Sequence, residues 1–179
     1  MDENVMKTAR DYLEKAGLDA DQIVGLERIG YFKAPASCRH HLAVKGGLAE
    51  HSVNVTKHIL ELGAFRSFVY NPRSPYLVGM LHDLVKCMCY EDAGDGVFRY
   101  VVPPYPGHGV ASVMIAQELG IALSPLEAAC IAWHMGAFGL NDEEMKHYSA
   151  AVRRCPHAII LTHAADHLAS VCEDILERK

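Results

Sequence analysis

The chain has 179 residues, of which 50% are hydrophobic and 22% charged, the balance of one globular domain and not of a disordered protein. Its 17 lysines and arginines against 22 aspartates and glutamates give a net charge of −5, so no basic excess draws it to nucleic acid or an anionic membrane. It begins without a secretory signal and has no apolar run of roughly 18 residues, which predicts a cytoplasmic protein without membrane spans.

Helix signals dominate the first half of the chain. The apolar period of about 3.6 residues predicts helices over residues 2–16, 23–30 and 47–62, the last closed by Gly63. Residues 31–39 contain Pro35 and are expected to form a loop or a single turn. Ser74 and Pro75 then predict the start of a strongly apolar, largely buried helix that continues to Met88.

Residues 90–106 interrupt this pattern. A turn-forming segment at 92–96 followed by strand-like residues predicts a small hairpin or an ordered flap. Further helices are predicted over 107–119, 125–135, 141–154 and from Pro156 to the C-terminus, and Ser124 and Glu127 have the spacing of a capping box. Without repeats or a linker, we expect one all-α domain over residues 1–179, with N-terminal helices over 1–36.

The six cysteines carry no metal-binding signature. They lie at positions 38, 87, 89, 130, 155 and 172, and none forms a C-x-x-C pair. We expect buried, reduced thiols, as in cytoplasmic proteins.

Histidine is the unusual component, with 11 residues in a chain of this length. It is the commonest metal ligand and the usual acid or base near neutral pH. Several histidines and two aspartates lie in apolar stretches of separate predicted helices, where polar groups are costly to bury unless they are paired or metal-bound. They are His51, His82, Asp83, His108, His134 and Asp166. One histidine alone is more often a hydrogen-bonded core residue, so the adjacent pair at 82–83 is the stronger indication.

The residue types in this set suit divalent metal ions. Imidazole and carboxylate together fit Mn, Fe, Co, Ni or Zn, and no thiolate is needed. One catalytic metal needs an open position, so six protein ligands exceed what it uses. The set fits two metals that share a carboxylate, an arrangement that activates water and clamps a phosphoryl group.

The order of these residues resembles the H…HD…D pattern of the HD-domain superfamily of metal-dependent phosphohydrolases. Residues 40–52 resemble the segment around the first metal-binding histidine of the family. Residues 80–86 resemble its central motif, and residues 161–166 resemble its closing helix. The resemblance covers roughly residues 40–172 and implies an HD-type helical bundle. Residues 90–106 lie between its ligand groups, where a lid would carry Arg99, Tyr100 or Tyr105 toward a substrate, although an insertion without contact fits equally.

By the same resemblance, two metals divide the ligands between them. One takes His51, His82, Asp83 and Asp166, and the second takes His108 and His134 with Asp83 as the bridge. Many two-metal members have a glycine where this chain has Val85, which favours a more regular helix at the following Lys86.

Three further histidines and Lys86 are expected near the metals. Lys86 would neutralise a substrate phosphate, with a surface position as the alternative. His41, or else His40, would contact the substrate or donate a proton to the leaving oxygen. His163, three residues before Asp166, would support the ligands, and local hydrogen bonding alone fits all three histidines equally.

The resemblance implies a hydrolase of phosphomonoesters or phosphodiesters that acts on nucleotides or other small phosphorylated molecules. The expected catalytic residues are Asp83, Lys86 and His41. Two alternatives stay open: some relatives in the superfamily hold two irons with the same ligands and act as oxygenases, and a ligand-binding domain without catalysis is the other. No nucleic-acid-binding module accompanies the motif, so nucleic acid is not favoured as a partner.

Overall fold

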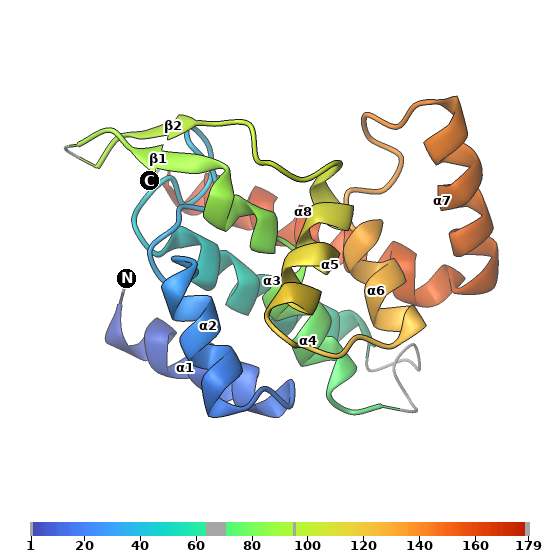
Figure 1. Ribbon diagram of the computed structural model, residues 1–179, viewed down its shortest axis with the longest axis horizontal. Helices are drawn as coiled ribbons and strands as arrows, with labels where there is room; N and C mark the ends of the chain where they lie inside the picture. Colours follow the sequence, from blue (N-terminus) through green and yellow to red (C-terminus); the bar gives the residue numbers. More distant parts are fainter. Residues whose placement is uncertain (1, 64–70, 95, 178–179) are drawn as a thin grey trace.

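The computed structural model describes residues 2–63, 71–94 and 96–177, which fold mainly into helices (Figure 1). The α-helices in these ranges are α1 (Glu3–Lys15), α2 (Ala20–Arg28), α3 (Gly47–Gly63), α4 (Ser74–Leu81), α5 (His108–Glu118), α6 (Pro125–Ala132), α7 (Asp142–Arg154) and α8 (Pro156–Glu177). A 3₁₀ helix, η1 (Leu84–Met88), and the strands β1 (Tyr90–Asp92) and β2 (Phe98–Tyr100) lie between α4 and α5. The predicted all-α class with a small hairpin is confirmed. The last two residues of the predicted C-terminal helix lie outside the described ranges.

Capping boxes fix where three of these helices begin. In each, a short polar side chain accepts from the third helical residue, whose own side chain accepts from the cap backbone. The pairs are Asp19 with Gln22, Ser124 with Glu127, and Asn141 with Glu144. Helix α2 therefore begins at Ala20, earlier than predicted, because the apolar period alone does not show the Asp19 cap.

The prediction of one continuous helix from Ser74 to Met88 is wrong at residues 82–83, between α4 and η1. Helix α4 ends at Leu81, Asp83 leaves the helical region with φ −113° and ψ 24°, and η1 follows. The Val85 amide donates to Ser112 Oγ at 3.2 Å and not to a carbonyl of its own helix. The regular helix expected around Val85 is therefore absent, and the break redirects the chain at the His82–Asp83 pair.

Close packing positions the helices that carry the predicted ligands. Helix α3 packs against α1, α4 and α8, and α5 packs against α6 and η1. A Cβ on Gly79 of α4 would lie 2.3 Å from Thr56 Oγ1 of α3, and a Cβ on Gly109 of α5 would lie 2.3 Å from the Ala132 carbonyl oxygen of α6. Glycine at these two places lets the backbones approach. These close contacts place α4 against α3 next to His82, and they place α5 against the C-terminal end of α6.

The remaining elements lie at the edges of the bundle. Strands β1 and β2 pair antiparallel, with Tyr90 opposite Tyr100, and α7 stands at the end of the molecule away from α1 and α2 (Figure 1). None of the described helices has the length and apolar character needed to cross a bilayer. The cysteines have free thiols, and Cys172 is exposed, contrary to the expected burial of all six.

Candidate metal centre

Two of the predicted ligand histidines, His82 and His134, follow the ends of short helices and are held in the same way. The Nδ1–H of His82 donates to the Gly79 carbonyl at 2.8 Å, and the Nδ1–H of His134 donates to the Ile131 carbonyl at 2.7 Å. In both cases the acceptor is three residues earlier, in the last turn of α4 or α6. A carbonyl oxygen only accepts, so Nδ1 carries the proton and Nε2 of the neutral ring has a free lone pair. Both Nε2 atoms are buried and have no hydrogen-bond partner.

The carboxylate of Asp83 lies at the centre of the cluster. Its Oδ1 is 2.6 Å from His108 Nε2 and 3.3 Å from His134 Nε2, and its Oδ2 is 3.3 Å from His82 Nε2 and 2.6 Å from Lys86 Nζ. Burial alone would raise the pKa of Asp83, but the Lys86 ammonium, followed by the neighbouring imidazoles of His82 and His108, holds that pKa well below its usual value. The group is therefore an anion in a nearly water-free place.

His51 of α3 is clamped between two carboxylates of α8. Its Nε2 lies 3.1 Å from Asp166 Oδ1 and its Nδ1 lies 2.9 Å from Glu173 Oε2. Burial lowers the pKa of His51, but these two hydrogen bonds outweigh it and raise the pKa to about 9. Asn54 donates to the other oxygen of Glu173 at 2.8 Å, so this buried carboxylate is itself held in place.

The sequence reasoning missed Glu173. It lies seven residues, about two helical turns, after Asp166, so both side chains emerge on one face of α8. That spacing is the only signal the sequence offers, and acidic residues at such spacings are common on exposed helix faces. Burial of Glu173 against His51 comes from the packing of α8 on α3.

The arrangement fits bound cations. When both rings are neutral, the Nε2 lone pairs of His82 and His134 face oxygens of Asp83 at 3.3 Å. A lone pair and a carboxylate oxygen at this distance repel each other unless a proton or a cation lies between them. Donor atoms gather within 4.8 Å in several groups, including His51 with His82 and Asp83, and Asp83 with His108 and His134. Asp83 is common to both of these groups, as a bridging ligand would be. All six predicted ligands are thus brought together.

A cavity of about 700 Å³ opens onto this cluster. His41, Lys86 and His163 line it together with Asp83, His108 and Asp166. The ring of His41 lies 5.0 Å from that of His51, and burial, followed by the charges of His51 and Lys86, lowers the pKa of His41. His163 donates through Nδ1 to the His134 carbonyl at 2.8 Å and so supports the backbone at this predicted ligand. His40 is exposed and is not among the residues that line the cavity.

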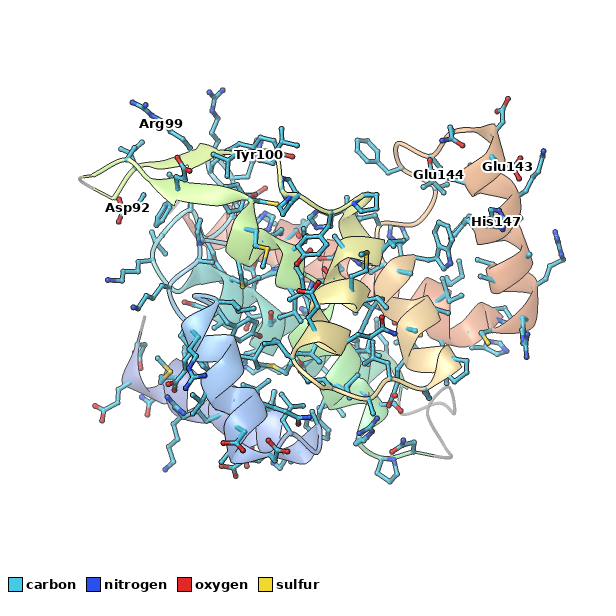
Figure 2. The ribbon with its side chains drawn as sticks, viewed as in Figure 1. Asp92, Arg99, Tyr100, Glu143, Glu144 and His147 are labelled. Carbon is cyan, nitrogen blue, oxygen red and sulfur yellow. The ribbon has the colours of Figure 1, made fainter. Side chains whose placement is uncertain are left out.

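The residues expected on a lid lie elsewhere. Tyr100 and Tyr105 line a smaller cavity of about 260 Å³ that shares His108 with the larger one. The side chain of Arg99 points away from the body of the molecule, and Asp92 lies on the part of the hairpin that extends outward (Figure 2). The described residues of the hairpin contribute no side chain to the large cavity.

The comparisons with known proteins give one relative and no family assignment. The chain is 32% identical over 103 residues to a dihydroneopterin 2′,3′-cyclic phosphate phosphodiesterase of Methanocaldococcus jannaschii, a match that covers 55% of this chain and 41% of that protein. The chain thus spans less than half the length of this relative. No family model matches the chain, and no solved structure matches it significantly.

We expect Asp83→Ala to lose divalent metal binding and to unfold at a lower temperature, because the imidazoles and Lys86 lose their common anionic partner. Metal content after loading with Mn²⁺ and desalting, with the unfolding temperature from circular dichroism, checks both effects. Asp92→Ala, an exposed aspartate of the hairpin, should keep the metal content of the parent. A fully loaded Asp83→Ala protein would show that Asp83 is not the shared ligand.

Glu173→Ala should weaken divalent metal binding by about 10- to 100-fold, the usual effect of removing a group that orients a metal ligand. Glu173→Gln keeps an acceptor for the His51 ring without the charge and should fall between parent and Glu173→Ala. Competition with a fluorescent chelator measures the affinities, and Glu61→Ala, an exposed acidic side chain of α3, is the control. Parental affinity in both Glu173 variants would exclude the orienting role.

Proposed function

We propose that this chain is a phosphodiester hydrolase of the HD-domain superfamily that uses two divalent metal ions. The observation that carries the proposal is the buried Asp83 carboxylate among the Nε2 atoms of three histidines, two of which have no hydrogen-bond partner. The proposed ligands are His51, His82, Asp83, His108, His134 and Asp166, and the donor set suits Mn, Fe, Co, Ni or Zn.

Two similarities of the sequence support hydrolysis of a phosphodiester. The relative in Methanocaldococcus jannaschii is a phosphodiesterase of a cyclic phosphate, and the motif order in this chain resembles that of a phosphohydrolase superfamily. The oxygenase alternative has no observation of its own, because its ligand set is the same. Loss of catalysis is disfavoured by the presence of all six ligand residues in one cluster.

Metal ions held at such a site lower the pKa of a bound water and neutralise negative charge on a phosphoryl group. The chain's own residues would bind and orient the substrate. Lys86 places an ammonium group at the wall of the cavity, next to the cluster, where it binds phosphate oxygen as a point charge. His41 has a lowered pKa and is therefore neutral near pH 7, which suits hydrogen bonding to the substrate better than proton donation to the leaving oxygen.

Hydrolysis of bis(p-nitrophenyl) phosphate tests the proposal. The protein loaded with Mn²⁺ should release p-nitrophenolate, lose this activity with a chelator and regain it when Mn²⁺ is restored. The rate should be the same under nitrogen as in air, because hydrolysis consumes no oxygen. Absence of hydrolysis with each of the five metals at full loading would refute the proposal, and an oxygen-dependent activity would favour the oxygenase.

We expect Lys86→Met to lower kcat/KM for the same phosphodiester by about 10- to 100-fold, the value of one charged hydrogen bond to phosphate. The substitution keeps the length of the side chain and removes its charge. Lys57→Met, at an exposed position of α3, is the matched control and should keep the parental rate. Metal content is measured alongside, so that a decrease in kcat/KM at full loading identifies a contact to substrate. An unchanged kcat/KM would place Lys86 outside the reaction.

A further inference from the structure

Three of the proposed metal ligands meet at the first turn of α5, although they come from separate parts of the chain. Asp83 lies between α4 and η1, His108 begins α5, and His134 follows α6 closely. One donor atom of each lies within 4.8 Å of the donor atoms of the other two. The backbones of η1, α5 and α6 must therefore be held at fixed separations for these three side chains to meet.

On the side of α6, direct contact between backbones sets the separation. A Cβ on Gly109 would lie 2.3 Å from the Ala132 carbonyl oxygen and 2.5 Å from the Ile131 carbonyl oxygen. The Ile131 carbonyl is also the acceptor of the His134 ring, at 2.7 Å. The residue after His108 thus lies against the carbonyl that orients His134, and no side chain fits between them.

On the side of η1, a single hydroxyl joins the two backbones. Ser112 lies about one helical turn after His108 and is fully buried. Its Oγ accepts from the Val85 amide at 3.2 Å and donates to the His108 carbonyl in a long hydrogen bond of 3.4 Å. Val85 lies between Asp83 and Lys86 in the sequence. Ser112 therefore connects the segment that carries Asp83 to the segment that carries His108.

Burial gives this contact a large effect. A buried amide without an acceptor is costly, so the chain around it shifts until the amide finds one. Without the Ser112 hydroxyl the Val85 amide loses its acceptor, and a shift of η1 displaces Asp83 and Lys86 with it. Asp83 Oδ1 is 2.6 Å from His108 Nε2, a separation that leaves little tolerance for such a shift.

We infer that Ser112 is a positioning residue of the metal centre, which holds η1 and α5 at the separation that brings the Asp83 carboxylate to the His108 ring. Ser112 does not line the large cavity, and it acts through the Val85 amide and the His108 carbonyl. This inference rests on the proposed metal site and adds a residue that is not itself a ligand.

Ser112→Ala tests this role, with Ser74→Ala as the matched control. The Ser74 hydroxyl is buried as well, and it joins the start of α4 to α6 by donating to Glu127 Oε1 at 2.9 Å. Ser112→Ala should weaken the binding of at least one Mn²⁺ ion by about 10- to 100-fold, the usual effect of removing a group that orients a metal ligand. Ser74→Ala should keep the parental affinities. Calorimetry on chelator-treated protein measures both.

Two further measurements separate positioning from stability alone. Ser112→Thr keeps the hydroxyl and should restore the parental Mn²⁺ affinities. In the metal-free protein, the Val85 amide should exchange its hydrogen faster in Ser112→Ala than in the parent, Ser74→Ala or Ser112→Thr, as measured by NMR. If Ser112→Ala does not fold, Ser112→Cys, whose thiol is a weaker acceptor, should show the same losses to a smaller degree.

The outcomes keep this inference distinct from the proposed function. Parental Mn²⁺ affinities in Ser112→Ala, or an equal loss in Ser74→Ala, would overturn the inference even if both variants unfold at a lower temperature. A parent that binds none of the five metals would refute the proposed metal site instead. The NMR signals of the His108 ring in the metal-free proteins then decide the role of Ser112. A displacement in Ser112→Ala alone would support it, and unchanged signals would exclude it.

Discussion

The structure depends on keeping one carboxylate, Asp83, charged in the interior of a helical bundle. A buried carboxylate without partners is so costly that it would take up a proton or unfold the region around it. Here four imidazole rings and the Lys86 ammonium surround it. Of these groups Lys86, His82 and His108 keep its pKa low. Helices far apart in the sequence are therefore held to a common point by charge as well as by apolar packing.

The same constraint explains the local irregularities of the backbone. Helix α4 stops at Leu81 and a 3₁₀ helix begins at Leu84, and this break lets His82 and Asp83 both face the cluster although they are adjacent. Helix α6 stops just before His134, and that ring uses the same bond to the carbonyl three residues earlier. With Nδ1 occupied in both rings, each Nε2 is directed inward before any ligand binds, which is the preorganisation that a metal site requires.

Sequence reasoning recovers what local chemistry determines. The apolar period and the caps at Ser124 and Asn141 predict the helices closely, and polar residues within apolar stretches predict the six members of the cluster. It does not recover what packing decides. The break at His82–Asp83 depends on Ser112, 27 residues away from Val85 in the sequence, and the burial of Glu173 depends on α3 lying across α8. The contact of Val85 with Ser112 leaves no periodic signal in the sequence, and the burial of Glu173 leaves only its seven-residue spacing from Asp166.

The segment from His134 to Phe138 runs beside the cavity, and hydrogen bonds hold its first residue. His134 is held by the Ile131 carbonyl on one side and, through its own carbonyl, by His163 on the other. Phe138 lies four residues further on and is exposed, so its replacement disturbs neither of these bonds.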